Sequence, residues 1–139
     1  MRSTGTADTS QPLRVVIAPD SFKGSLSAAD AAEALAAGWS SVRPQDGVVS
    51  SPQADGGEGT MDAIARATQG SEVRSAGMVE GPDGGPVEGR WLQLADGTAV
   101  VELAQTSGLP LMRTPDAMGA TSRGLGQVVA AALDAGAAR

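Results

Sequence analysis

The residues best suited to chemistry lie in a glycine-rich acidic stretch at 54–60, which contains three glycines and two carboxylates. Glycine lets the backbone approach a ligand closely, and free N–H groups at the start of a following helix attract an anion such as phosphate. Asp55 and Glu58 do not suit a bare phosphate, but they suit a Mg²⁺ ion that bridges one, or a substrate hydroxyl. The alternative is a plain glycine-rich turn with solvated acids.

A second candidate stretch contains Lys23, the single lysine of a chain with nine arginines. A compact, flexible ammonium suits a position beside a triphosphate or a carboxylate. Asp20, Ser21 and Ser25 flank it and add an acceptor and two hydroxyls. Ordinary turn and cap chemistry explains these flanking residues equally well.

The composition excludes several classes of chemistry. With no cysteine and no histidine, the chain has no structural zinc site, no disulfide, no thiol nucleophile and no Ser-His pair. A formal net charge of −6 argues against nucleic acid or an anionic membrane as the main partner. No apolar run approaches the roughly 18 residues of a membrane helix, and the first 12 residues lack the apolar core of a secretion signal. We therefore expect a cytoplasmic protein.

Hydrophobic patterning predicts that the first half is built from two strand-helix units. The strands are expected at 13–18 and 48–51, the first of them central and buried on both faces of a parallel sheet. Ligands bind at the carboxyl ends of parallel strands, so the loops at 20–25 and 54–60 should face one crevice. The first helix should begin at a capping box, Ser27 with Asp30, stop at Arg43-Pro44, and bury Ala32, Leu35, Ala36, Trp39 and Val42; the second should run from 60 to about 68.

The second half changes character near Ser71. Strands expected at 72–79, 87–94 and 98–103, the last two joined by Asp96-Gly97, form an antiparallel meander, followed by a loop region at 106–119. Glu102, near the end of the third strand, could face a cleft or solvent, and the sequence favours solvent. Thr121 and Ser122 start a final helix, where they could hold an anion or simply cap the helix. Its apolar face is expected to contain Leu125, Val128, Val129, Ala132 and Leu133.

Several segments, taken in order, resemble the bacterial type I glycerate kinases. They are 16–28, 54–60, Gly81-Pro82 with Trp91, 101–104 with 107–109, and Thr121-Ser122-x-Gly124-x-Gly126. The resemblance extends from about Arg14 to Arg139. It implies a two-domain α/β enzyme, with a parallel-sheet α/β/α domain and a second, β-containing domain inserted into it. In the cleft between the domains, ATP and Mg²⁺ would meet D-glycerate, and a phosphoryl group would pass to a glycerate hydroxyl.

The resemblance also implies roles for individual residues. Lys23 and Asp55 match catalytic positions, Lys23 beside an anionic group of substrate or nucleotide, and Asp55 with Glu58 beside Mg²⁺ or the glycerate hydroxyls. The substrate- or phosphate-binding set implied by the matching loops contains Asp20, Ser21, Ser25, Gly56, Gly57, Glu58, Thr121 and Ser122.

The expected domain organisation is a disordered tail at 1–12, the first part of a Rossmann-like or flavodoxin-like α/β domain at 13–72, and the start of the second domain at 73–139. Family members are well over twice as long, so we expect an amino-terminal fragment in which both domains are incomplete. Such a piece should leave apolar faces uncovered and have little activity alone. The alternative is a non-catalytic fragment that keeps only a phosphate- or nucleotide-binding crevice.

Overall fold

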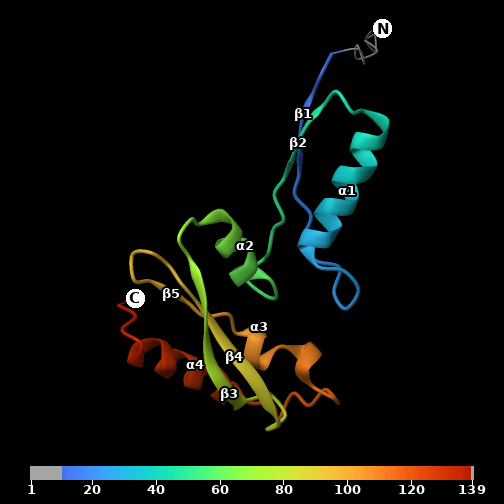
Figure 1. Cartoon of the computed structure of the whole chain (residues 1–139). Coiled ribbons are helices and arrows are strands. Elements are labelled where there is room, and N and C mark those ends of the chain that lie inside the picture. The colour runs from blue at the N-terminus through green and yellow to red at the C-terminus, as the bar shows by residue number, and fades with distance from the viewer. Residues whose placement is uncertain (1–10, 139) are drawn as a thin grey trace, which may run out of the picture.

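The computed structural model describes residues 11–138; of the lead-in predicted at 1–12, only the exposed Gln11 and Pro12 fall within the described residues. The described part is a mixed α/β structure with a parallel strand pair and an antiparallel sheet (Figure 1). Across these residues, every helix is too short or too polar to cross a membrane. In chain order the elements are β1 (Arg14–Ile17), α1 (Ala28–Val42), β2 (Gly47–Ser50), α2 (Thr60–Ala67), β3 (Glu72–Glu80), β4 (Pro86–Gln93), β5 (Ala99–Val100), α3 (Ala104–Ser107), the 3₁₀ helix η1 (Leu109–Leu111) and α4 (Arg123–Asp134).

Two strand-helix units form the first half, as predicted. β1 and β2 pair in parallel, from Arg14 opposite Gly47 to Ile17 opposite Ser50, and α1 packs alongside them (Figure 1). The predicted helix start at Ser27 is confirmed as an N-cap, because the Asp30 N–H donates to Ser27 Oγ at 3.1 Å; Ser27 Oγ in turn donates to Asp30 Oδ2 at 2.6 Å. This cap fixes the point at which the loop after β1 becomes helix.

The predicted burial of β1 on both faces is wrong. Val16 is 67% exposed, because the described residues place two strands in this sheet and α1 against it. The expected apolar face of α1 is likewise only partly covered: Leu35 is 52% and Val42 80% exposed, whereas Ala32 is buried. The strand-helix pattern was therefore sufficient to predict the elements but not which of their faces other elements cover.

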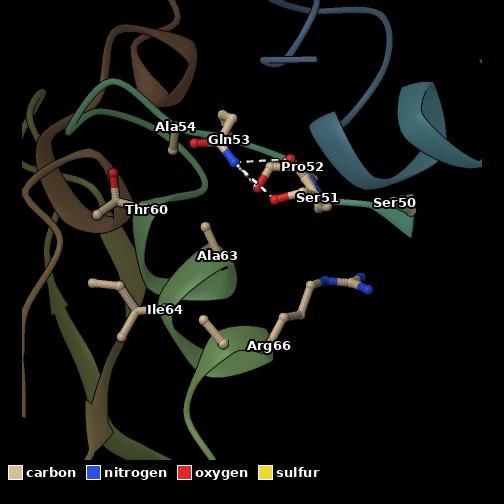
Figure 2. Close-up of a pocket in the computed structure, with 10 residues that line it drawn as sticks. Ser50, Ser51, Pro52, Gln53, Ala54, Thr60, Ala63, Ile64 and Arg66 are labelled. Carbon is tan, nitrogen blue, oxygen red and sulfur yellow. Dashed lines mark hydrogen bonds between the residues drawn. The ribbon is translucent and has the colours of Figure 1, made fainter. Parts of the chain in front are cut away.

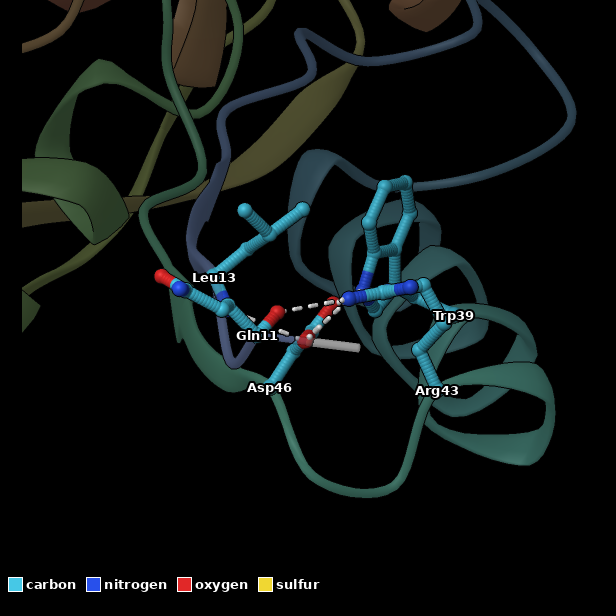
Figure 3. A network of polar contacts seen from close by, with 5 residues as sticks. All are labelled: Gln11, Leu13, Trp39, Arg43 and Asp46. Atoms are coloured by element: carbon cyan, nitrogen blue, oxygen red, sulfur yellow. Dashed lines mark hydrogen bonds and ion pairs between the residues drawn. The ribbon is translucent and has the colours of Figure 1, made fainter. Parts of the chain in front are cut away.

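A buried carboxylate joins the end of α1 to the start of β1 (Figure 3). Asp46 Oδ2 accepts from Arg43 Nε at 2.7 Å and from Trp39 Nε1 at 2.9 Å. Its Oδ1 accepts from Arg43 Nη2 and from the Leu13 N–H, both at 3.0 Å. The hydrogen bond from Arg43, aided by those from Leu13 and Trp39, holds the pKa of Asp46 well below its usual range.

This cluster predicts a pH-dependent contribution to stability. Because the folded-state pKa of Asp46 is lowered, its stabilisation is present above the unfolded-state pKa of about 4 and is lost as the pH falls below it. We expect Asp46→Asn to lower the thermal midpoint at pH 7, and the difference from the native chain to narrow between about pH 5 and pH 3. Circular dichroism melts measure both. The exposed α1 variant Glu33→Gln should follow the native chain throughout; a constant gap for Asp46→Asn would contradict the charge argument.

The second half is an antiparallel meander with the strand order β3-β4-β5. The predicted Asp96-Gly97 hairpin is confirmed: Gly97 has a φ of +87°, and Asp96 Oδ1 accepts from the Thr98 N–H at 2.9 Å. The third strand is shorter than predicted, because Leu103 already has helical backbone angles and α3 begins directly after it. The region predicted as loop, 106–119, accordingly includes the end of α3 and all of η1.

The core of this half lies where α4 packs against β3 and β4. Its buried members include Val79 and Trp91 from the sheet and Val128 and Ala132 from the helix. The buried stripe of α4 continues to Gly124 at a four-residue spacing, whereas two residues predicted on this face are not on it: Val129 is 41% and Leu133 60% exposed. Glycine is needed here, because a Cβ at Gly124 would collide with the backbone carbonyl of Glu80.

The two glycines of α4 provide a matched pair of substitutions. Gly124→Ala should lower the free energy of unfolding by about 2 kcal/mol, since the added methyl meets backbone that cannot move easily. Gly126→Ala meets nothing within 4 Å and should stabilise the helix by about 0.5–1 kcal/mol. Urea unfolding of the three proteins measures both effects, and equal stabilities would contradict the packing described for α4.

Candidate active site

A crevice runs beside α2, between this helix, the segment 50–54 that follows β2, and the loop before α1. It consists of three hollows of about 360, 100 and 330 Å³ that share lining residues, and we refer to it as the α2 crevice. Figure 2 shows the hollow of 360 Å³, with segment 50–54 on one side and α2 on the other. This is the carboxyl end of β2, where ligands of parallel sheets are held.

Lys23 enters the crevice from the tip of a tight hairpin. Phe22 and Leu26 exchange two backbone hydrogen bonds, with N···O distances of 2.9 and 3.1 Å, and the Ser25 N–H donates to the Phe22 carbonyl at 2.9 Å. Gly24 has a φ of +77°, a conformation typical of the third residue of a type II turn. The turn fixes the backbone at Lys23, and its exposed side chain lines the hollow of 330 Å³.

The acidic glycine loop, residues 55–59, leads directly into α2. Asp55 Oδ1 accepts from the Gly57 N–H at 3.1 Å, and Thr60 Oγ1 donates to the Gly57 carbonyl at 2.9 Å. Gly56 and Gly59 have φ values of +98° and +90°, so two positions need glycine for backbone conformation alone. Asp55 therefore takes part in shaping the turn, in agreement with the alternative that this stretch is a plain glycine-rich turn.

The two loops predicted to face one crevice do meet there. Of the predicted site residues, Ser21, Lys23, Ser25 and Glu58 line the hollow of 330 Å³. The other predicted site residues of the two loops, Asp20, Asp55, Gly56 and Gly57, are not among the residues that line any of the three hollows. Asp20 Oδ1 accepts from the Ser21 N–H at 2.6 Å.

Thr121 and Ser122 lie elsewhere, ahead of α4 on the antiparallel half. The Thr121 N–H donates to the Pro82 carbonyl at 3.0 Å, and Thr121 Oγ1 accepts from the Arg123 N–H at 3.1 Å. Ser122 is the N-cap residue, but its side chain makes no capping hydrogen bond. Neither residue lines the α2 crevice.

The expectation that Glu102 faces solvent is wrong. Its side chain is buried, with 4% of the residue exposed. Glu102 Oε2 accepts from the Met61 N–H at 2.8 Å, and Oε1 accepts from the Gly59 N–H at 3.2 Å. The start of α2, where an anion was expected, thus already holds a carboxylate of the chain itself. The position of Glu102 between apolar Val101 and Leu103 is the one signal in the sequence that could have indicated burial.

Further residues of the crevice were missed by sequence reasoning. Asp62 and Gln105 line the hollow of 330 Å³ together with Lys23, and Gln105 Oε1 accepts from Arg90 Nη2 at 2.9 Å. Arg66 lines two of the hollows and extends beneath Ser51 in Figure 2. An acid in the first helical turn, such as Asp62, is ordinarily explained by the helix dipole, so its type gives no sign of a site.

The hollow around Lys23 is lined by one ammonium and two carboxylates, those of Glu58 and Asp62. Within residues 11–138 no three acidic side chains are grouped so that they could hold a metal ion by themselves. Mg²⁺ commonly takes one or two carboxylates and completes its shell with phosphate oxygens and water. Of the pair of acids predicted for it, Glu58 lines the hollow and Asp55 does not.

Comparison with known proteins matches the chain to one family. The profile of the "Glycerate kinase family" matches residues 15–139. "Glycerate kinase" of Bacillus subtilis (strain 168) is 46% identical over 132 residues, which are 91% of this chain and 34% of that protein. "Glycerate 2-kinase" of Escherichia coli (strain K12) is 44% identical over 128 residues, 90% of this chain and 33% of that protein.

Among solved structures, a crystal structure described as a glycerate kinase 2 from Salmonella typhimurium LT2 matches with a TM-score of 0.65 at 37% sequence identity. The match covers 91% of this chain and 34% of that one. The chain therefore spans about a third of the length of the relatives it matches.

Proposed function

Since the chain belongs to the glycerate kinase family, we propose that it provides part of the site for ATP-dependent phosphorylation of D-glycerate. The observation that carries this proposal is the hollow shared by the two loops, which is lined by both Lys23 and Glu58. An ammonium and carboxylates in the lining of one hollow suit a substrate that has both anionic groups and hydroxyls. ATP and Mg²⁺ are the proposed co-substrate and metal ion, and the cytoplasm is the proposed compartment.

Phosphoryl transfer depends on positioning and charge neutralisation more than on covalent help from the protein. We assign the Lys23 ammonium to a phosphate of the nucleotide or to the glycerate carboxylate, and the Ser21 and Ser25 hydroxyls to hydrogen bonds with the same groups. Asp55 and Glu58 would hold Mg²⁺, which when bound neutralises phosphate charge, or would orient the glycerate hydroxyls. The N–H groups of Gly57 and Gly59 already have acceptors in the chain, so most of the attraction for phosphate falls to Lys23.

The role of Thr121 and Ser122 as phosphate-binding residues remains part of the proposal, but only with a ligand that reaches beyond the α2 crevice. We likewise propose that 13–72 and 73–139 are parts of two domains, the second inserted into the first. The parallel pair in one segment and the antiparallel sheet in the other support that division.

Because the chain spans about a third of its relatives' length, we propose that turnover needs residues those relatives have beyond the matched part. The second candidate is a fragment without activity that keeps a phosphate- or nucleotide-binding crevice. Hydrogen bonds within this chain fix the turn that carries Lys23. This favours the view that the chain alone retains some binding of phosphate or nucleotide.

A coupled ADP-release assay tests the proposed activity. The chain is assayed alone and fused to the portion of the Bacillus subtilis relative that follows the matched segment. We expect ADP release only from the fusion, and only with both D-glycerate and Mg²⁺ present. Binding of ATP by the chain alone, measured calorimetrically, tests the second candidate. ADP release from neither protein, with both folded, would contradict the assigned reaction.

Lys23→Ala in the active fusion should lower turnover by about 100-fold or more, because a charge that stabilises the transferring group is lost. The matched control is Arg14→Ala, which removes one positive charge from an exposed position of β1 outside the crevice. Its rate should equal that of the parent fusion. A rate for Lys23→Ala close to the parent rate would remove Lys23 from the site.

Asp55→Asn separates charge from shape. The asparagine keeps an oxygen that accepts the Gly57 N–H, so the turn is retained while the negative charge is lost. If Asp55 holds Mg²⁺, turnover in the fusion should fall at least about 100-fold and recover in part at raised Mg²⁺ concentration. Asp134→Asn, at the exposed end of α4, serves as the control. Full activity of Asp55→Asn would restrict this residue to shaping the loop.

A further inference from the structure

Glu102 is a buried carboxylate that bridges segments far apart in the sequence. It lies two residues after the end of β5, yet its two oxygens bind N–H groups that lie 41 and 43 residues earlier, at the start of α2. Burying a carboxylate is costly unless hydrogen bonds compensate for the lost water. Here the compensation comes from two N–H groups at the positive end of a helix dipole.

The two N–H groups lie where the acidic glycine loop ends and α2 begins. Gly59 is both the N-cap residue of α2 and the last residue of the acidic glycine loop, and its φ of +90° turns the loop into the helix. Gly59 lines the Lys23 hollow beside Glu58. A side chain that holds Gly59 therefore also sets where the preceding carboxylates stand.

A second residue of the segment that contains Glu102 lines the crevice itself. Three residues after Glu102, Gln105 lines the hollow that contains Lys23, and its amide is held by Arg90 of β4 at 2.9 Å. The antiparallel half thus contributes Gln105 to the lining of the hollow, and Glu102 binds the end of the acidic loop.

We infer that Glu102 is a positioning residue: its carboxylate fixes the acidic glycine loop and the first turn of α2 against the antiparallel sheet, so that Asp55 and Glu58 stand in a defined place relative to Lys23. Its importance for catalysis rests on the proposed function, but its effect on the loop does not. Glu102 also neutralises the positive end of α2, which leaves Lys23 as the cation of this hollow.

Residue-resolved amide hydrogen exchange on the 139-residue chain tests the inference without any substrate. In Glu102→Gln one oxygen is replaced by an amide donor, so at least one of the two N–H groups loses its acceptor. We expect exchange at Gly59, Met61 or both to become at least about tenfold faster and the Gly57 amide resonance to shift. The amide of Val79, in the core of the antiparallel half, should keep its native rate. The matched control is Glu88→Gln, an exposed carboxylate on β4.

Glu102→Asp keeps the charge on a shorter side chain and should restore part of the protection, which also provides a readout if Glu102→Gln does not fold. Native exchange at both Gly59 and Met61 in Glu102→Gln, or an equal rise at Val79, would overturn the inference. In the active fusion, Glu102→Gln should lower kcat at least about tenfold with little change in the KM for ATP. Since the exchange experiment needs no turnover, a failure of the proposed function leaves its result intact.

Discussion

The contact between Glu102 and the first turn of α2 is the interaction on which the arrangement of the candidate site depends. It connects the start of α2 to the segment that follows β5, and it does so with a charged group that has little access to water. A carboxylate in this position requires its N–H partners, because losing them would leave a buried charge unpaired. The acidic loop and the first turn of α2, which packs against β4, are thereby fixed to the antiparallel half of the chain.

This constraint also changes how the glycine-rich loop works. A helix start preceded by glycines is usually regarded as a place for phosphate. Here the Glu102 carboxylate accepts the N–H groups at the helix start, and Asp55 accepts the Gly57 N–H to close a turn. In the proposed site, the attraction for an anionic ligand shifts to Lys23 on the other loop, in a hollow that also contains the carboxylates of Glu58 and Asp62. The proposed site thus combines charges of opposite sign in the lining of one hollow, in place of a backbone cradle.

The sequence was sufficient to predict elements whose signals are local. The Ser27-Asp30 cap, the Asp96-Gly97 hairpin and the meeting of the two loops at the strand ends each depend on nearby residues or on a general rule of parallel sheets. The features that could not be predicted from the sequence depend on contacts between residues far apart in the chain. The burial of Glu102 is decided by a helix start about forty residues earlier.

The prediction of which residues of α4 and β1 are buried failed for a related reason. In α4 the spacing of Val129 and Leu133 fits an apolar face as well as that of Val128 and Ala132 does, and only the position of the sheet distinguishes them. In β1 the apolar run predicted a covered strand, but composition does not reveal which elements are present to cover it.

The hairpin that carries Lys23 has a kinetic consequence. Backbone hydrogen bonds between Phe22 and Leu26 and the conformation of Gly24 close the hairpin, while the Lys23 side chain at its tip remains exposed. A cation held in this way reaches a ligand by rotation about its own side-chain bonds, which takes picoseconds to nanoseconds, and not by loop closure, which takes far longer. In the proposed site, capture of an anion would therefore be limited by diffusion of the ligand into the crevice and not by reorganisation of the loop.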